Sequence, residues 1–347
     1  MKFSVGYQID KREMFVSEII KRREQINEVY FAFGDFANGR HRSTRDLYLD
    51  PETARERQLS ELMALSDAGI SLNLLLNTNC YGADSLARSF YEKIGDTVDY
   101  FAENFSLTSV TTTSPIIAKF IKDNFPALDI RSSINMEIGT PAAMDYIKEY
   151  YDSFYLRREL NRDIEGILRA KKWCEENGKK MYMLANSGCL NYCPVHNFHD
   201  NLVAHEEEIM SRDNAFEFHS VCKKRLQNKE TAVSLLRDSN FVRPEDIHLY
   251  DGLFEAAKLA TRVNPNPTQI LRAYTTGKYI GNLAELLEPD HSSAIAPYIL
   301  ENTLIPQDFA ERVMKCDKNC DKCRYCDKIF QKALKKYNEG VFIYANE

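Results

Sequence analysis

The sequence predicts a TIM-like (β/α)8 barrel followed by a cysteine-rich helical extension. Over the first 285 residues, short β-like apolar runs alternate with amphipathic helical runs, which is typical of parallel strands joined by helices. There are eight such strand-like runs, and 347 residues suffice for a barrel of about 250 residues plus an appendage. After Leu283 the alternation stops and a cysteine-dense pattern begins.

The eight strands are expected at Lys2–Gln8, Glu28–Gly34, Ser71–Thr78, Thr108–Thr113, Asp129–Ser133, Ser153–Leu156, Lys180–Asn186 and Asp246–Tyr250. Helices are expected between them, as at Met14–Gln25, Thr53–Ala68, Pro115–Asn124, Pro141–Tyr150, Asp163–Asn177 and Asn266–Tyr274. Two of these helices begin with a Ser-Pro or Thr-Pro pair, which places proline in the first turn. A doubly wound open sheet is the alternative, but no glycine-rich phosphate motif follows a first strand.

The chain is expected to divide into a barrel, residues 1–285, and a C-terminal extension, residues 286–347. Within the barrel, residues 187–241 are too long for a simple connection between a strand and a helix. This insertion contains three cysteines and four histidines, namely His196, His199, His205 and His219. Because it is rich in cysteine, histidine and aromatic residues, we expect an ordered functional segment.

The overall composition is that of an ordinary soluble enzyme. Hydrophobic residues make up 44% of the chain and charged residues 28%, and the net charge is −6. This acidic balance argues against an extended nucleic-acid footprint, although a local basic patch stays open. No apolar run of membrane-spanning length and no signal peptide is present, so we expect a cytoplasmic protein.

Nine cysteines in a reducing compartment indicate metal ligation rather than disulfides. Cys189 and Cys193 directly follow the seventh expected strand, and Cys222 lies in the same insertion. Three thiolates at the barrel mouth favour an iron–sulfur cluster, with zinc bound by cysteine and histidine as the alternative. The fourth ligand is Cys80 at the end of the third strand, a cysteine of the tail, or a position left open for substrate.

A second constellation closes the chain, with spacings of three, two and two residues between Cys316, Cys320, Cys323 and Cys326. Four thiolates so spaced can hold one structural zinc ion or a second cluster. The first three also match the radical S-adenosylmethionine loop, but their place at the chain end and Lys322 before the third cysteine argue against it. A single cysteine nucleophile assisted by histidine fits clustered thiols poorly.

Several motifs, in order, resemble the collagenase-like peptidase family of unassigned catalytic type, peptidase family U32. They are Arg158-Glu159-Leu160, Gly188-Cys189 through Cys193, Phe241–His248 leading into Lys258-x3-Arg262, and Ala273–Tyr279. The resemblance spans residues 1 to about 285. The stretch Met183–Gly188 replaces the usual Glu-x-Phe-x-His-Gly run, the spacing to the second cysteine is shorter, and the cysteine tail is an addition. These departures indicate a divergent branch.

The resemblance implies a TIM-like barrel with a [4Fe–4S] cluster, because better-understood relatives are oxygen-independent hydroxylation proteins. Those act on ubiquinone precursors or RNA bases, some with prephenate as the hydroxyl source. On this hypothesis Cys189, Cys193 and Cys222, with Cys80 as fourth ligand, hold the cluster. The tail cysteines hold a second cluster or zinc.

Two further roles follow for charged residues. Arg158, Lys258 and Arg262 orient an anionic substrate or donor, since guanidinium groups bind carboxylates in a bidentate manner. Glu159 and His196 are candidates for proton transfer. The structural alternative is an Arg158–Glu159 ion pair that braces the barrel.

The expected substrate is a small molecule, an RNA base or a peptide. Two alternatives to a redox enzyme are a zinc-stabilised accessory subunit and a peptidase, as the family name suggests. The basic terminal stretch Asp327–Tyr337 is interpreted first as a solvated helix face, and a surface that docks a protein partner or RNA is the alternative.

Overall fold

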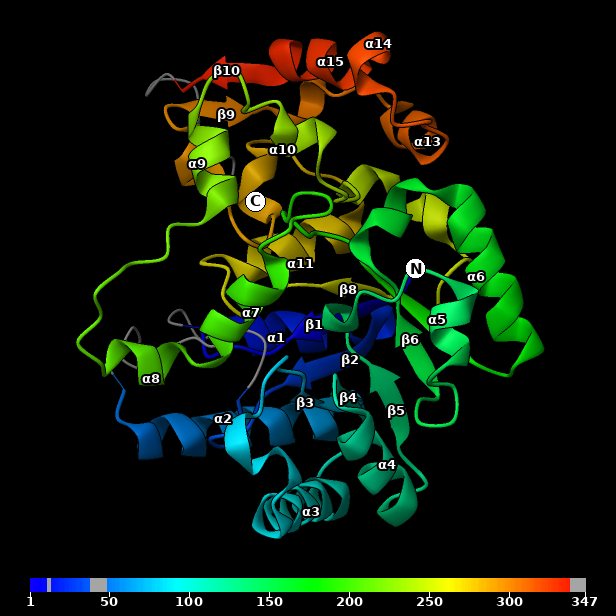
Figure 1. Ribbon diagram of the computed structural model, residues 1–347, viewed down its shortest axis with the longest axis vertical. Helices are drawn as coiled ribbons and strands as arrows, with labels where there is room; N and C mark the ends of the chain where they lie inside the picture. Colours follow the sequence, from blue (N-terminus) through cyan, green and yellow to red (C-terminus); the bar gives the residue numbers. More distant parts are fainter. Residues whose placement is uncertain (11–13, 38–48, 338–347) are drawn as a thin grey trace.

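The computed structural model describes residues 1–10, 14–37 and 49–337 and confirms the barrel (Figure 1). Eight parallel strands close in chain order, with the last hydrogen-bonded to the first. They are β1 (Phe3–Gly6), β2 (Ile26–Phe31), β3 (Leu72–Leu76), β4 (Leu107–Thr112), β5 (Asp129–Ser132), β6 (Ser153–Tyr155), β7 (Lys180–Leu184) and β8 (Ala257–Leu259). Seven of them match the expected segments to within a few residues.

The eighth strand was wrongly placed by the sequence analysis. Asp246–Tyr250 belongs to a 3-10 helix, Pro244–Tyr250, and the strand that closes the barrel is Ala257–Leu259. Proline followed by two acidic residues is a helix-start signal, and it outweighed the β-like composition of the residues after it. The true strand spans only three residues, too few to show a period. This correction places Lys258 inside the barrel wall.

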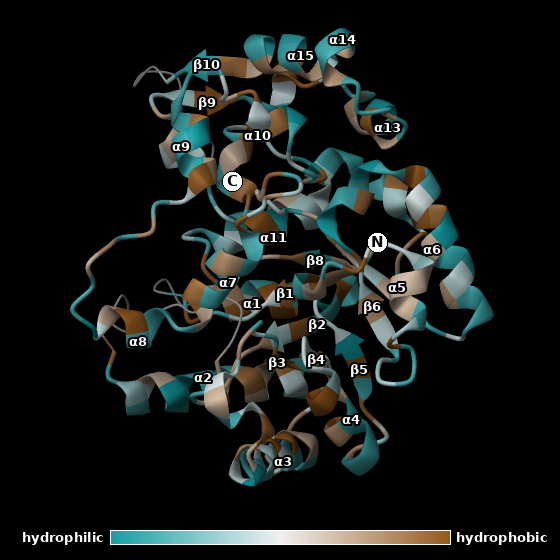
Figure 2. Ribbon diagram, in the orientation of Figure 1, coloured by the Kyte–Doolittle hydropathy of each residue, from teal (hydrophilic) through white to brown (hydrophobic). Residues whose placement is uncertain are grey.

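Helices surround the strands and cover their outer faces. They are α1 (Phe15–Lys21), α2 (Pro51–Asp67), α3 (Arg88–Asn104), α4 (Pro115–Asn124), α5 (Pro141–Asp145), α6 (Ile164–Glu176) and α11 (Pro267–Thr276). The proline-led helices begin where expected, because Ser114 and Thr140 accept hydrogen bonds from the free backbone N–H groups of the first turn. Figure 2 shows hydrophobic and hydrophilic residues interleaved along the outer helices, and the buried residues of α3 and α4 are apolar. No helix in the described ranges has the length and apolarity required to cross a membrane.

The insertion and the extension pack against each other beyond the barrel. The insertion forms α7 (His196–Ala204), α8 (Glu206–Met210), α9 (Val221–Gln227) and α10 (Ser234–Arg237). The extension forms α12 (Ser292–Ile295), β9 (Tyr298–Leu300), α13 (Phe309–Met314), α14 (Cys320–Cys323), α15 (Tyr325–Ala333) and β10 (Leu334–Lys336). It is therefore not purely helical, because β9 and β10 pair antiparallel. Helix α10 contacts α15 and α9 contacts α12 (Figure 1).

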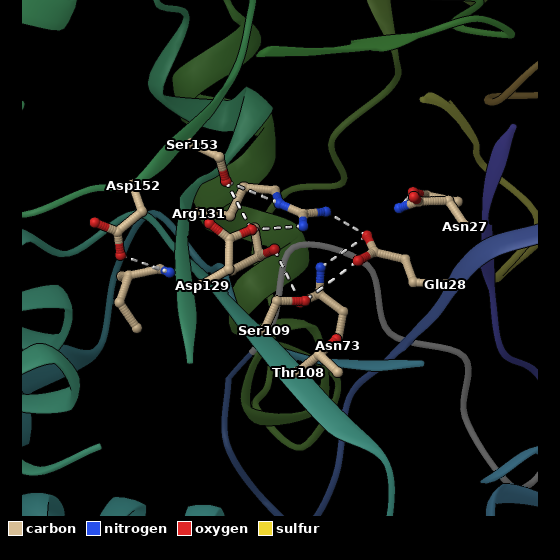
Figure 3. A network of polar contacts seen from close by, with 12 residues as sticks. Asn27, Glu28, Asn73, Thr108, Ser109, Asp129, Arg131, Asp152 and Ser153 are labelled. Atoms are coloured by element: carbon tan, nitrogen blue, oxygen red, sulfur yellow. Dashed lines mark hydrogen bonds and ion pairs between the residues drawn. The ribbon is translucent and has the colours of Figure 1, made fainter. Parts of the chain in front are cut away.

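A charged network lies inside the barrel (Figure 3). Glu28 of β2 and Arg131 of β5 form an ion pair in which the two side chains are 2% and 3% exposed. Arg131 also contacts Asp129 at 2.7 Å. The remaining groups of the pair are hydrogen-bonded by polar side chains of neighbouring strands, namely Asn73, Ser109 and Ser153. Such complete pairing is what a buried charge requires.

Candidate functional site

A pocket opens at the carboxyl ends of the strands, the face that carries the active site in barrel enzymes. Residues from six strand ends, from α7 and from the extension line it, and we call it the mouth pocket. Its polar lining includes Tyr30, Asn77, Asn135, Arg158, Asp200, Lys258, Arg262 and Glu288, with Cys189 on the wall. Its cavity of about 60 Å³ holds a few water-sized groups, enough for a carboxylate.

Lys258 is the deepest cation of this pocket. Its Nζ lies 4.0 Å from the ring centre of Tyr30 and 5.0 Å from that of Tyr155. No carboxylate within the described ranges forms an ion pair with it. Burial, and then the positive charge of Arg262, lower the pKa of Lys258 to about 7. The amine can therefore gain or lose its proton near neutral pH.

Arg158 and Arg262 line the same pocket as Lys258. Arg158 is buried, and its Nε makes no hydrogen bond within the residues described. Gly6 on β1 makes room for Arg262, because a Cβ there would come within 2.7 Å of both Arg262 and Tyr30. The three cations that the sequence resemblance singled out thus converge on one pocket.

Glu159 does not join them. Its carboxylate binds the Arg157 guanidinium at 2.9 Å and accepts the backbone N–H of Tyr192 at 3.0 Å. Burial raises the pKa of Glu159, but these hydrogen bonds outweigh burial and hold it below its usual value. Tyr192 has a positive φ of 50° and lies between Cys189 and Cys193, so Glu159 fixes the cysteine loop. The expected Arg158–Glu159 brace is instead an Arg157–Glu159 pair.

His196 starts α7 and lies between two carboxylates. Its Nδ1 is 3.3 Å from Glu137 and its Nε2 is 3.5 Å from Asp200, which lines the mouth pocket. The ring is buried, and neither nitrogen meets the geometry of a hydrogen bond within the described ranges. The position suits a proton-transfer group close to the pocket.

The insertion cysteines face two different spaces. Cys189 lines the mouth pocket, whereas Cys193 and Cys222 line a larger cavity of about 440 Å³ on the far side of the cysteine loop. Burial first, and then the neighbouring thiols of Cys189 and Cys222, raise the pKa of the Cys193 thiol. Cys80 is absent from the described lining of both spaces.

The larger cavity, here called the thiol chamber, also receives the tail. Cys316, Cys320 and Cys326 share its wall with Cys193 and Cys222. An adjoining cavity of about 310 Å³ is lined by all four tail cysteines. None of the nine cysteines, all within the described ranges, forms a disulfide. Cys174 stays apart in the core, with its Sγ 4.0 Å from the Met144 sulfur.

One observation argues against a preformed metal site at these thiols, and another favours an anionic centre beside them. Among residues 1–10, 14–37 and 49–337, no three Cys, His, Asp or Glu side chains are already arranged around a metal position. A metal bound in the chamber would therefore require thiol side chains to rotate toward it. In favour of an anionic centre, Arg162 lines the chamber, is 6% exposed, and has two guanidinium nitrogens without hydrogen-bond partners in the described structure.

Sequence reasoning missed Arg162, Asp200 and Glu288. Arg162 follows the Arg-Glu-Leu motif, but nothing in its local sequence separates it from a surface arginine. Asp200 lies on a short insertion helix and Glu288 in the connector to the extension, so only the folded chain brings them to the pocket. Gly188 of the cysteine motif allows close packing, because a Cβ there would lie 2.6 Å from the Pro289 carbonyl oxygen.

Comparisons with known proteins agree with this fold. No profile of a known protein family matches the chain. A protein of Methanocaldococcus jannaschii, named an uncharacterized protease, is 26% identical over 96% of this chain and 99% of its own length. The solved structure of a U32 peptidase covers 74% of this chain and 92% of its own, with 15% identity and a TM-score of 0.51, and shares the fold. The full-length relative and the common barrel agree with the resemblance of the ordered sequence motifs to the U32 peptidase family.

Proposed function

We propose that the protein is an iron–sulfur enzyme that binds a carboxylate-bearing substrate at the barrel mouth and modifies it without molecular oxygen. The observation that carries the proposal is the convergence of Arg158, Lys258 and Arg262 on one narrow pocket walled by Cys189. Arg158 and Lys258 are buried and Arg262 is half-buried beside them. Buried cations favour an anionic ligand, because they have lost hydration and gain most from a negative partner.

Each cationic residue of the mouth pocket has a separate role in the proposed binding of the carboxylate. Arg158 and Arg262 each offer a planar fork of N–H donors to a carboxylate, and Lys258 supplies a point charge below them. Asn77 and Asn135 line the same pocket, where the Asn135 side-chain amide donates to the Asn77 backbone carbonyl oxygen at 3.2 Å. His196, held near Asp200, is placed to move a proton at the edge of the pocket.

The metal part of the proposal rests on thiol chemistry. Cys189, Cys193 and Cys222 lie on one loop and one helix beside the pocket, and thiolates are the ligands that iron–sulfur clusters require. When bound, such a cluster would supply electron transfer next to the substrate. Glu159 serves it indirectly by fixing the loop between Cys189 and Cys193.

Oxygen-free purification with iron, sulfide and zinc analysis tests the metal. Iron and sulfide in near-equal amounts support the redox enzyme, whereas zinc without sulfide supports the accessory subunit instead.

Calorimetric titration with malate tests whether the mouth pocket binds a carboxylate. Arg158→Gln should weaken malate binding about 10-fold or more, as expected for a lost charged hydrogen bond. Arg169→Gln, an exposed arginine on α6, is the control and should bind as the unaltered protein does.

Peptide hydrolysis is the second candidate. It is favoured by the name of the archaeal relative and by His196, whose two carboxylate neighbours could support a general base. Cleavage of an unstructured protein such as casein by metal-free enzyme, abolished in His196→Asn, would support this candidate over the redox reaction.

A further inference from the structure

We propose that the C-terminal tail completes a single sulfur-ligated metal centre with the insertion, and that Arg162 neutralises the negative charge of that centre. The ligands come from Cys193 and Cys222 of the insertion and from Cys316, Cys320 and Cys326 of the tail. This proposal rests on the proposed function for the presence of a metal. It replaces two separate sites, one in the barrel and one in the tail, with one shared chamber.

The first support is the joint lining of the chamber. Five thiols from two segments that are far apart in sequence, the insertion and the tail, face a single cavity of about 440 Å³. Cys80, the other candidate for fourth ligand, lies outside the lining of both described spaces. A tail thiol is therefore the better-placed partner for Cys193 and Cys222.

The second support is Arg162, which comes from the barrel side of the chamber. Its Nη1 donates to the Leu236 carbonyl oxygen at 2.9 Å, and its Cζ lies 5.6 Å and 5.5 Å from the ring centres of Phe241 and Phe309. The Nε and Nη2 atoms remain without hydrogen-bond partners in the described structure. A buried guanidinium left in this state is costly unless it meets an anion.

The thiol chamber has a mainly positive lining, which is complementary to a negatively charged metal–thiolate centre. Four cationic side chains line it, namely Arg162, Arg225, Arg237 and Lys318, against one carboxylate, Asp238. A metal held by four thiolates carries net negative charge as zinc or as a [4Fe–4S] cluster, so either centre suits this lining. The adjoining cavity of the tail cysteines has cations of its own, but none of them is buried as Arg162 is, namely Arg237, Arg312, Lys315 and Arg324.

The third support is the way the tail is docked. Lys318, between Cys316 and Cys320, reaches Tyr192, between Cys189 and Cys193, with its Nζ 3.4 Å from the tyrosine Oη. On the other side, Arg237 of α10 pairs with Asp327 of α15 at 3.4 Å. Both contacts join residues that neighbour candidate ligands, so they hold the two cysteine segments face to face.

Cobalt titration tests the shared centre without reference to catalysis. Full-length protein, purified without oxygen and stripped of metal, is titrated with Co²⁺ alone, and the thiolate-to-cobalt charge-transfer absorption is recorded. We expect Cys222→Ser and Cys320→Ser each to remove most of the same absorption band. Cys174→Ser, in the core, and Cys80→Ser are the controls and should leave the band and its stoichiometry unchanged.

Arg162 variants test the counter-charge. Arg162→Gln should weaken Co²⁺ affinity about 10- to 100-fold, as loss of an outer-shell partner does, and Arg162→Lys should restore part of it. Circular dichroism shows whether each variant is folded, and the lysine variant keeps the test decisive if the glutamine variant is not. Equal affinity in folded Arg162→Gln and unaltered protein would overturn the role of Arg162.

One result would overturn the shared centre. If Cys222→Ser and Cys320→Ser each removed a different, independent part of the cobalt absorption, the insertion and the tail would hold separate metals. The proposed function fails differently, through absence of iron and sulfide or of malate binding in the mouth pocket. A zinc-bearing chamber with no malate binding would refute the proposed function and leave the shared centre intact.

Discussion

Two buried cations of the same barrel, Arg131 and Lys258, have opposite surroundings. Arg131 is paired with Glu28 and Asp129 and hydrogen-bonded to Ser153. Lys258, on the wall of the mouth pocket, faces two tyrosine rings and forms no ion pair with a described carboxylate. The charges that act on its pKa are Arg262, which lowers it, then Glu28, which raises it, and then Arg131 and Arg158, which lower it. We call the Arg131 network the lower layer, and Lys258 with the mouth pocket the upper layer. Both contact Tyr155, with Arg131 5.7 Å and Lys258 5.0 Å from its ring centre.

The difference indicates that Arg131 has a structural role and Lys258 a role in ligand binding. A cation whose partners are supplied by the protein stabilises the fold, and its removal exposes those partners to an apolar surrounding. A cation without a carboxylate partner costs stability and gains its partner only when a ligand arrives. The lower layer should therefore govern unfolding and the upper layer binding.

The largest expected effect is on the lower layer. Glu28→Leu leaves Arg131 with only the partly exposed Asp129 as a carboxylate partner, and we expect a loss of about 3–5 kcal/mol in the free energy of unfolding. Urea denaturation measures it. Glu24→Gln, at an exposed carboxylate, should change the free energy of unfolding by no more than about 0.5 kcal/mol.

The double variant Glu28→Leu with Arg131→Met sharpens this test. Because both charges are then removed together, it should be more stable than Glu28→Leu alone. A Glu28→Leu protein as stable as the unaltered one would show that the layer does not hold the barrel together, and the contrast with Lys258 would be lost.

Lys258→Met should lower malate affinity without lowering the free energy of unfolding, the opposite of what is expected for Glu28→Leu. Removing a buried amine without a carboxylate partner should leave the free energy of unfolding unchanged or raise it, since the desolvation cost disappears. Malate affinity should fall about 10-fold or more, in line with the loss of a charged hydrogen bond. Lys180→Met, an exposed lysine at the start of β7, should alter neither. Strong destabilisation by Lys258→Met would place Lys258 with Arg131 as a structural charge.

The pH dependence of malate binding should show that the Lys258 amine contacts the ligand. Burial and Arg262 lower the pKa of Lys258 to about 7, so the amine is protonated below that pH and neutral above it. Malate affinity should therefore decrease as the pH rises through about 7. Lys258→Arg should abolish that decrease, because the guanidinium stays protonated throughout. An unaltered pH profile in Lys258→Arg would assign the titration to another group.

The same contrast explains what the sequence could and could not predict. Seven strands follow from apolar runs that alternate with capped helices, and the mouth residues Arg158, Lys258 and Arg262 follow from motif order. The eighth strand was misplaced because three residues, Ala257–Leu259, show no period. Arg162 was not predictable, because its burial and its unpartnered nitrogens depend on how the insertion and the tail fold against η5 (Arg158–Arg162).

The smallest expected effect concerns Glu159, which belongs to the structural class although it adjoins the pocket. Glu159→Gln retains an acceptor but loses the ion pair with the half-exposed Arg157, so we expect a loss of about 1 kcal/mol in the free energy of unfolding at neutral pH. Hydrogen bonds hold the pKa of Glu159 below its usual value, so this stabilisation is complete above the pKa of an unfolded glutamate, about 4.3. It disappears as the pH falls through the lower folded pKa.

Urea denaturation of both proteins at neutral and at acidic pH measures this difference, which should shrink on acidification. Thiol labelling provides the local readout, because the carboxylate also holds the Tyr192 backbone between Cys189 and Cys193. Labelling of the cysteine loop should be faster in Glu159→Gln than in Glu165→Gln, an exposed glutamate on α6. Equal labelling rates would mean that the positive φ of Tyr192 is maintained without Glu159, and that the loop geometry depends on Arg157 and the tail alone.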